Sequence, residues 1–355
     1  MKKILWVFGP KAHAHTGIGN YSTHLLSLIH GSPDLSIDEK WMEAKPKSLK
    51  HYFLFLFYIP LFLFLKSKKY DNVVLYEEAF SFFLPFIRTK SIIIVHDVRS
   101  DFNKSESLRM NLKKKIVSKL NSYLNLASKI VSPSDFTRTA LKNVTTNKNL
   151  LVAYNSIQLE EFRKKPLDKS SLFEKHNIPI NKNTIYLLYV GSEETRKNFI
   201  TLLDTLEILE SNYHLIKIGK PVIQENRELH LKKISQSKLN VTIIDFISQE
   251  DLINFYQNCD IFLFPSTFEG FGRPPAEAQA AGLPVISTHC ASLKEIVADS
   301  AIIVNNPTDP IEWKSAIEKL SDPQEQDKLI QLGYQNCKRF SVENQAKIWL
   351  EILEA

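Results

Sequence analysis

The sequence predicts an α/β protein made of two doubly wound, parallel-sheet domains of the Rossmann type. Two observations support this prediction. Short apolar runs, each suited to one buried strand, alternate with longer segments of helical character along the whole chain. The chain has 355 residues, 44% hydrophobic and 24% charged, which is a folded composition too long for one typical core. Strands that alternate with helices pair in parallel, so we expect helices on both faces of each sheet.

The first half of the chain begins with an apolar run after Met-Lys-Lys, which is too short for a signal peptide, so we expect a cytoplasmic protein. Helices are expected near Asn20–Ile29, His51–Leu65, Ser105–Ala127 and Asp135–Lys142. Strands are expected at Ile4–Phe8, Val73–Tyr76, Ile92–Val95, Lys129–Val131 and Leu150–Ala153.

The second half repeats this alternation, with helices between its strands and two or three more after residue 309. Because ligands of doubly wound sheets bind beyond the carboxyl ends of the strands, loops that follow strands are the candidate sites. The strands are expected at Ile185–Val190, Leu215–Ile218, Val241–Ile244, Ile261–Phe264, Pro284–Ser287 and Ala301–Val304.

The loop after Ile261–Phe264 has the most informative local pattern in the chain. Glu269 and Glu277 stand eight residues apart, around a Gly-Phe-Gly turn, Arg273 and a Pro-Pro pair, and a helix is expected over Ala276–Ala281. Glycine lets a backbone approach a ligand closely, and free N–H groups at a helix N-terminus suit a diphosphate. The two carboxylates are hydrogen-bond acceptors, and we expect them to bind sugar and ribose hydroxyls.

This segment resembles the E-x7-E motif of the retaining family-four glycosyltransferases, which have the GT-B fold. The resemblance covers nearly all of residues 184–341 in order. It includes Tyr189-Val190-Gly191-Ser192, Arg196-Lys197-Asn198, Ser248 to Ser266, Ala281 to Ile286 and Ser292 to Ile296. It implies two Rossmann-like domains facing across a cleft: an acceptor-binding domain at 1–165, a linker at 166–182, a nucleotide-sugar domain at 183–340, and a terminal helix at 341–355 that crosses back to the first domain.

The resemblance also implies the roles of the site residues in the second domain. Lys197, with adjacent Arg196 and Gly191, is expected to neutralise the departing diphosphate, although Ser192 stands where many relatives have an arginine. Glu277 is expected to accept hydrogen bonds from ribose. Glu269 and the loop residues Gly270, Phe271 and Gly272 are expected nearer the sugar and phosphate. Arg273 replaces a usually apolar residue and is expected to add charge near the diphosphate or to alter sugar choice.

In the first domain the resemblance is looser. Gly17 and Gly19 follow the first strand and are expected to face the diphosphate and the acceptor. His96 ends the run Ile92–Val95, where the resemblance implies that it borders the transferred sugar. Its role as base or as orienting group stays open at this point.

No Asp-x-Asp occurs in the sequence, so the usual ligands of a metal-bridged diphosphate are missing. We therefore expect turnover with no metal and no cofactor. Retention of configuration is implied by the resemblance, through a same-face reaction in which the donor phosphate acts as the base.

Charge and hydropathy are unevenly distributed. Residues 1–178 carry 28 Lys or Arg against 15 Asp or Glu, whereas residues 179–355 carry 17 against 24. No nucleic-acid motif accompanies the basic half, so an anionic membrane leaflet or a phosphate-bearing lipid acceptor fits better. The 14 apolar residues Tyr52–Leu65, flanked by lysines within 45–69, are too short to span a bilayer and suit either a core helix or the membrane interface. Both interpretations hold if one face packs and the other enters lipid.

Together these features predict a hexosyltransferase that uses a nucleotide sugar and a glycan or polyprenyl-linked acceptor in lipopolysaccharide, O-antigen or capsule assembly. The R-K-N loop favours the mannosyltransferase branch, with GDP-mannose as donor. Two alternatives stay open: a GT-B epimerase or hydrolase that acts on the nucleotide sugar alone, and a catalytically silent binding protein. The silent alternative conflicts with the presence of Lys197 and both motif carboxylates.

Overall fold

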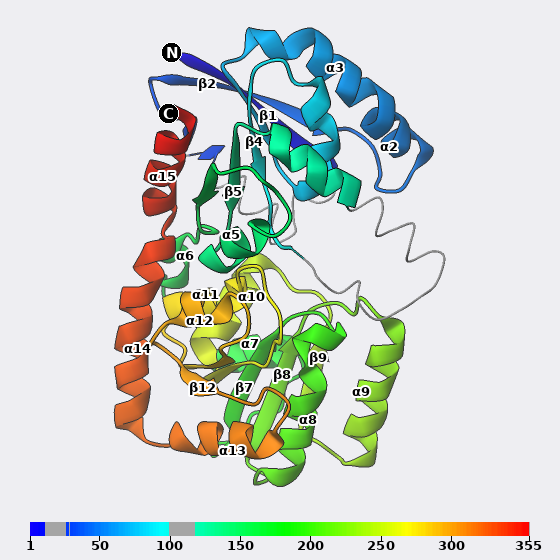
Figure 1. Ribbon diagram of the computed structural model, residues 1–355. Coiled ribbons are helices and arrows are strands. Elements are labelled where there is room, and N and C mark those ends of the chain that lie inside the picture. The colour runs from blue at the N-terminus through cyan, green and yellow to red at the C-terminus, as the bar shows by residue number, and fades with distance from the viewer. Residues whose placement is uncertain (11–25, 28, 99–117, 355) are drawn as a thin grey trace. The chain divides into compact units, whose positions relative to one another are not determined.

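The computed structural model describes residues 1–10, 26–27, 29–98 and 118–354, and the chain divides into two compact units (Figure 1). The first unit comprises Met1–Ser156 together with Val342–Ala355, and the second comprises Ile157–Ser341. Each unit contains one six-stranded sheet in which every neighbouring pair is parallel. The predicted α/β architecture of two parallel, doubly wound sheets is therefore confirmed.

The first sheet has the strand order β2-β1-β3-β4-β5-β6. Its central strands are mostly buried, as expected for a parallel sheet that helices cover on both faces. The strands are β1 (Lys2–Pro10), β2 (Leu35–Met42), β3 (Asn72–Leu75), β4 (Lys90–Ile94), β5 (Lys129–Ser132) and β6 (Leu150–Val152).

The edge strand β2 is the one strand of this sheet that the sequence did not predict. Its sequence LSIDEKWM is mostly polar, and only its two end residues are buried. An edge strand has one neighbour and partial solvent contact, so its residues need not form an apolar run. It pairs with β1 from Lys2 opposite Leu35 to Pro10 opposite Met42.

Residues Leu49–Lys69 form one long helix that covers part of the first sheet. It consists of four consecutive segments, α2, η2, α3 and η3. Proline at position 60 has no N–H and its ring crowds the preceding turn, which accounts for the wider π-helical turn just before it. The described part of the expected helix 105–127 is helical at 118–123. The helical segments of the first unit are α2 (Leu49–Phe53), η2 (Leu54–Tyr58), α3 (Ile59–Lys66), η3 (Ser67–Lys69), η4 (Glu78–Phe86), η6 (Leu124–Leu126), α5 (Asp135–Leu141) and α15 (Val342–Glu354).

The C-terminal helix α15 packs into the core of the first unit. Trp349 is fully buried, and its ring centroid lies 5.2 Å from that of Trp6 on β1. Asn72 at the start of β3 donates a hydrogen bond to the carbonyl of Leu353 at 3.1 Å. These contacts hold residues from the two ends of the chain in one hydrophobic core.

The second sheet has the order β12-β11-β10-β7-β8-β9. Its strands are β7 (Ile185–Val190), β8 (Tyr213–Ile218), β9 (Val241–Ile244), β10 (Ile261–Phe264), β11 (Val285–Thr288) and β12 (Ile302–Val304). Its helices are α6 (Leu159–Phe162), α7 (Lys169–Lys175), η7 (Thr195–Lys197), α8 (Phe199–Ile208), α9 (Gln224–Gln236), α10 (Gln249–Asn258), α11 (Arg273–Ala280), α12 (Leu293–Val297), α13 (Pro310–Lys319), α14 (Pro323–Cys337) and η8 (Lys338–Phe340).

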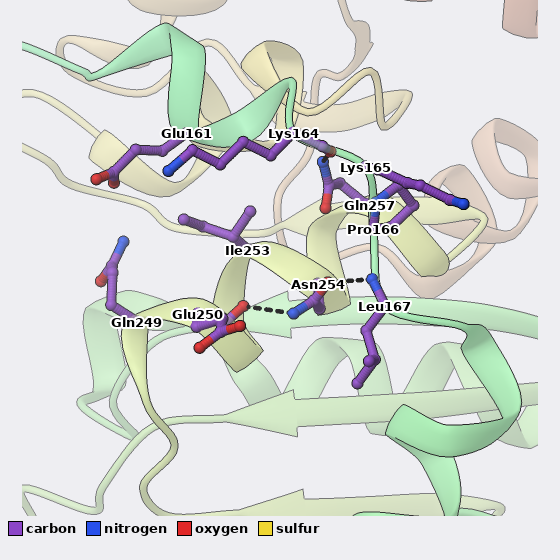
Figure 2. Close-up of a pocket in the computed structure, with 10 residues that line it drawn as sticks. All are labelled: Glu161, Lys164, Lys165, Pro166, Leu167, Gln249, Glu250, Ile253, Asn254 and Gln257. Atoms are coloured by element: carbon purple, nitrogen blue, oxygen red, sulfur yellow. Dashed lines mark hydrogen bonds between the residues drawn. The ribbon is translucent and has the colours of Figure 1, made fainter.

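Residues 166–182, which the sequence suggested as a linker, contain α7 and lie in the second unit. Figure 2 shows how the start of this segment joins α10: the Leu167 N–H donates to Asn254 Oδ1 at 2.7 Å, and Asn254 in turn donates to the Glu250 carbonyl at 3.0 Å. A pocket of about 520 Å³ lies between residues 161–167 and α10. The segment is therefore held by side-chain hydrogen bonds despite its polar composition.

Candidate active site

The candidate site of the second unit is formed by the loops that follow β7 and β10. These strands are direct neighbours, with Leu187 opposite Ile261. Since parallel strands end at the same edge of a sheet, residues 191–198 and 265–273 come together there. The Thr267 N–H donates to the carbonyl of Arg196 at 2.8 Å, which joins the two loops directly.

Glu269 lies at the centre of this site and is 8% exposed. Its Oε1 accepts hydrogen bonds from Lys197 Nζ and from the Ser266 hydroxyl, each at 2.6 Å. Its Oε2 lies 3.2 Å from Arg196 Nη1. The structure therefore brings three residues predicted from the sequence, Glu269, Lys197 and Arg196, into one ion-pair cluster, and it adds Ser266, which the sequence did not single out.

Arg196 is held in place by a second carboxylate and by the backbone. Its Nη2 lies 2.9 Å from Glu194 Oε2, and its Nη1 donates to the Phe268 carbonyl at 3.0 Å. Ser192 donates to the same Glu194 oxygen at 3.0 Å. Position 192, directly after Gly191, thus carries a hydroxyl that orients Glu194, the partner of Arg196.

Gly191 is required by the close packing of this loop. A Cβ at position 191 would lie 2.8 Å from the hydroxyl oxygen of Tyr189, which donates to the Ser192 carbonyl at 2.8 Å. Gly219, at the end of β8, has φ of +132°, and a Cβ there would lie 2.5 Å from the Gly191 carbonyl oxygen. Both positions therefore need glycine, and they fix the backbone that leads to Arg196 and Lys197.

The Gly270–Gly272 turn is held in place by hydrogen bonds from Ser292. The Ser292 hydroxyl lies 2.9 Å from the carbonyl oxygens of both Glu269 and Phe271. Gly272 has φ of +91° and caps α11, where a Cβ would lie 2.5 Å from a methyl group of Leu293. The helix α11 begins at Arg273, three residues before the predicted start, because both prolines fit its first turn.

Glu277 lies on α11 and is 5% exposed. Its Oε2 accepts from the Tyr256 hydroxyl at 3.0 Å, and its Oε1 lies 2.5 Å from Arg273 Nε. Burial, together with the nearby Glu277 carboxylate, raises the pKa of Tyr256 well above its ordinary value, so this hydroxyl stays a hydrogen-bond donor. Arg273 therefore contacts the second motif carboxylate, and Tyr256 is a site neighbour that the sequence did not reveal.

A buried ion cluster around Glu193 supports the same loop and was missed in the sequence. Glu193 and Lys217 have fully buried side chains 2.7 Å apart, and Arg227 and His230 also contact the carboxylate. Burial acts to raise the pKa of Glu193, but hydrogen bonds from Arg227, Lys217 and His230 outweigh it and lower that pKa to about 2. The available signal was a lysine within the apolar run of β8, because a fully buried lysine needs a partner.

His96 follows β4 in the first unit and is 8% exposed. Its Nε2 lies 3.0 Å from the Tyr76 carbonyl oxygen, which can only accept, so Nε2 carries the proton. Burial lowers the pKa of His96, against an opposing effect of Glu78. The imidazole is therefore neutral, and its buried Nδ1, which has no hydrogen-bond partner among the residues that the structure describes, is an acceptor. Gly17 and Gly19, predicted to lie near this edge, are outside the described residues.

Glu77 is a second ionisable group at this edge that the sequence did not identify. It follows the buried strand β3, and its Oε1 would lie 3.8 Å from a Cβ placed on Gly9 of the adjacent strand β1. Burial and the neighbouring Glu78 raise its pKa to about 7. A half-buried carboxyl with such a pKa at the carboxyl edge of a sheet is typical of a functional position.

Replacing Glu77 with Gln should stabilise the protein above neutral pH. In the unfolded chain this carboxyl titrates near 4.5, so between pH 4.5 and 7 the folded state alone keeps the proton and stability falls as pH rises. At pH 8 the variant should gain up to about 3 kcal/mol, and near pH 5 the gain should shrink to less than about 1 kcal/mol. Calorimetry at both pH values measures this difference. Glu174→Gln, at an exposed position, serves as the control, and an equal gain at both pH values would contradict the prediction.

Among the described residues, no group of three or more His, Cys, Asp or Glu side chains is arranged to hold a metal ion. The candidate site of the second unit is therefore described by its carboxylates, cations, hydroxyls and loop amides.

Comparison with known proteins gives a family match that lies within the second unit. Residues 170–336 match the family described as "Glycosyl transferases group 1". O-antigen chain mannosyltransferase B of Escherichia coli is 24% identical over 376 residues, which cover 96% of this chain and 97% of that protein. Capsular polysaccharide biosynthesis glycosyltransferase CapM of Staphylococcus aureus is 30% identical over 57% of this chain, which spans about half (52%) of that relative.

A solved structure, Anabaena Alr3699/HepE in complex with UDP and glucose, superposes with a TM-score of 0.82 and covers 100% of both chains. Its sequence is 16% identical, so this likeness shows the fold alone. The fold is the GT-B fold that the sequence resemblance implied.

Proposed function

We propose that this chain, whose residues 170–336 match the group 1 glycosyl transferases and whose fold is GT-B, moves a hexose from a nucleotide sugar to a glycan or lipid-linked acceptor. The observation that carries the proposal is the cluster of Glu269, Lys197 and Arg196 at the carboxyl edge of the second sheet. Relatives named for O-antigen and capsule assembly support a place in cell-surface polysaccharide biosynthesis. The proposed place of this reaction is the cytoplasmic side of the membrane.

In the proposed complex the donor diphosphate lies against Lys197, Arg196 and the amides of Gly270, Phe271 and Gly272, at the N-terminus of α11. Negative charge grows on the diphosphate as the glycosidic bond breaks. Cations and N–H groups held in place beforehand stabilise that charge without reorganising during the reaction. The hydrogen bonds to Glu269 and Glu194 supply this preorganisation, because they fix both cations before the donor arrives.

The two motif carboxylates keep capacity for substrate hydroxyls. A carboxylate has about four acceptor positions. Glu277 uses two of these positions, for Tyr256 and Arg273, which leaves two for the ribose hydroxyls. Glu269 uses three, for Lys197, Ser266 and Arg196, which leaves one on Oε2 for a sugar hydroxyl.

His96 is proposed to border the transferred sugar as a hydrogen-bond acceptor. A neutral imidazole with its proton on Nε2 offers Nδ1 to a sugar or acceptor hydroxyl. The reaction is proposed to retain the anomeric configuration, with a donor phosphate oxygen taking the proton of the acceptor hydroxyl on the same face. Glu269 orients the sugar in this scheme and does not attack it.

GDP-mannose is the proposed donor, supported by the mannosyltransferase names among the relatives. The experiment that tests the function is a transfer assay with GDP-mannose, UDP-glucose and other nucleotide sugars, each with and without a polyprenyl-linked glycan extract. A glycosyltransferase releases nucleotide mainly when acceptor is present. Equal release without acceptor would indicate a hydrolase, and epimerised donor would indicate an epimerase.

Turnover should persist in the presence of a strong chelator. The proposed charge stabilisation comes from Lys197, Arg196 and backbone amides, so removal of divalent ions should change the rate by less than about twofold, whereas losing a catalytic ion that stabilises developing charge would cost several kcal/mol. The assay is repeated with EDTA and then with added Mg²⁺ or Mn²⁺. A loss of activity that either ion restores would show that the proposed metal-independent reaction is wrong.

A further inference from the structure

The helix Leu49–Lys69 presents a continuous apolar surface to solvent. Its exposed large side chains recur every four residues, which places them along one ridge of the helix. Tyr52, Leu56 and Phe64 lie beside this ridge and are 46–50% exposed. The ridge consists of Leu49 (90% exposed), Phe53 (59%), Phe57 (63%), Leu61 (58%) and Leu65 (60%), and we call it the exposed ridge.

The opposite face of the same helix is built into the core of the first unit. Ile59 and Leu63 are buried in that core. The Phe55 ring packs against two aromatic rings of η4, with centroids 4.9 Å from Phe83 and 5.7 Å from Phe82. The helix thus has one packed face and one exposed apolar face, although its sequence is apolar all round.

Basic side chains surround the exposed ridge. Arg88 lies 4.9 Å from the centroid of Phe64, and Lys40 lies 5.0 Å from those of Tyr58 and Phe62. The lysines at both ends of the helix are all exposed: Lys45, Lys47, Lys50, Lys66, Lys68 and Lys69. An apolar ridge with cations at both ends and beside it complements an anionic lipid surface, where the ridge enters the acyl boundary and the cations meet headgroups.

We infer that this helix lies in the plane of an anionic membrane, with the exposed ridge inserted and the lysines at headgroup level. By length and composition alone, the 21-residue helix is long and apolar enough to cross a membrane. Spanning, however, would require Ile59, Leu63 and Phe55 to leave the core of the first unit, against which they pack. A helix that lies in the membrane plane keeps these core contacts and leaves every lysine in contact with water. The inference goes beyond the proposed reaction and does not depend on it.

The test is flotation of the full-length protein with vesicles of phosphatidylcholine alone or mixed with phosphatidylglycerol, at low and high salt. We expect binding to the anionic vesicles that weakens at high salt. Phe57→Ser with Leu61→Ser should weaken it at least tenfold. Replacing Lys66, Lys68 and Lys69 with Gln should weaken it by roughly fivefold for each lysine that reaches the headgroups. The matched controls are Leu229→Ser with Phe246→Ser, and Lys182, Lys232 and Lys319→Gln, all at exposed positions of the second unit.

Orientation is tested with one tryptophan added at a time and with brominated lipids, and the quenching is compared with that of the native protein, which has four tryptophans. Phe53→Trp, Phe57→Trp and Leu65→Trp should each be quenched to a similar, shallow depth, because an in-plane helix holds the whole ridge at one level. Depths that increase steadily along the helix would indicate a span and overturn the inference. Binding that ignores lipid charge, or a ridge-dependent dimer that vesicles cannot dissociate, would also overturn it. If the protein bound no nucleotide, the proposed function would be wrong, but the inference about the membrane helix would stand.

Discussion

Lys197→Ala should slow turnover by at least about a hundredfold, because one preorganised partner of developing charge contributes this much in comparable sites. In the structure Lys197 Nζ is fixed at 2.6 Å from Glu269 and lies 5.2 Å from the Phe264 ring centroid. Because its position is set before the donor binds, the loss should appear mainly in kcat and less in KM. Steady-state kinetics with saturating acceptor measures both parameters.

The control for this variant is Lys220→Ala. Lys220 is an exposed lysine that follows β8 at the same edge of the second sheet, and its Nζ lies over Phe246 at 5.0 Å. If general positive charge at this edge were enough, both variants would lose similar activity. We expect Lys220→Ala to stay within about threefold of the native rate, the size of a weak exposed electrostatic effect. A Lys197→Ala enzyme with near-native kcat would remove Lys197 from the proposed mechanism.

Glu277→Ala should abolish the stabilisation that the donor nucleotide gives to the folded protein. A nucleotide at a hundredfold excess over its dissociation constant stabilises the native state by about 3 kcal/mol. The two open acceptor positions of Glu277 are proposed to bind ribose, so its removal should reduce this shift to near zero. For each variant the melting temperature is measured with and without nucleotide, and the difference between the two is the shift that nucleotide binding causes.

Tyr256→Phe separates the ligand role of Glu277 from its structural role. Removing Glu277 leaves the buried Tyr256 hydroxyl without its 3.0 Å partner, and such a group costs about 1 to 3 kcal/mol. Tyr256→Phe also breaks that hydrogen bond, but it keeps the carboxylate. It should therefore retain most of the nucleotide shift. A Tyr256→Phe variant that loses the shift as completely as Glu277→Ala would indicate that the carboxylate acts through packing alone.

Most strands of the second unit could be predicted from the sequence. The bounds expected for β7, β9 and β10 are the observed bounds. Buried parallel strands are apolar on both faces, so they appear as short uninterrupted runs. The glycosyltransferase resemblance is confirmed by the family match over residues 170–336, while the finer assignment to family four stays a prediction.

The candidate site was predictable where its residues follow those strands. Arg196, Lys197 and Glu269 were chosen as separate motif positions, and the structure brings them together. Their partners were not predictable in the same way. Lys217 pairs with Glu193, and Tyr256 contacts Glu277, across gaps in sequence that no helical or strand periodicity connects. Lys217 and Glu193 come together because β7 and β8 are neighbours in the sheet. Tyr256 and Glu277 come together because the helices α10 and α11, which lie before and after β10 in the chain, contact each other.

The sequence by itself determined the order of the strands other than β2, the glycine positions of the loops and the motif residues Arg196, Lys197, Glu269 and Glu277 of the candidate site. The reason is that each of these follows from local periodicity or from a residue type that a tight backbone demands. The tertiary structure alone decided which face of Leu49–Lys69 is exposed. That helix is apolar on every side, so its sequence pattern does not show which face packs and which face is exposed. The packing of Phe55, Ile59 and Leu63 in the core of the first unit decides this and leaves the other face in solvent. The same holds for the pKa of Glu77, which depends on burial that the residue's position in the sequence does not reveal.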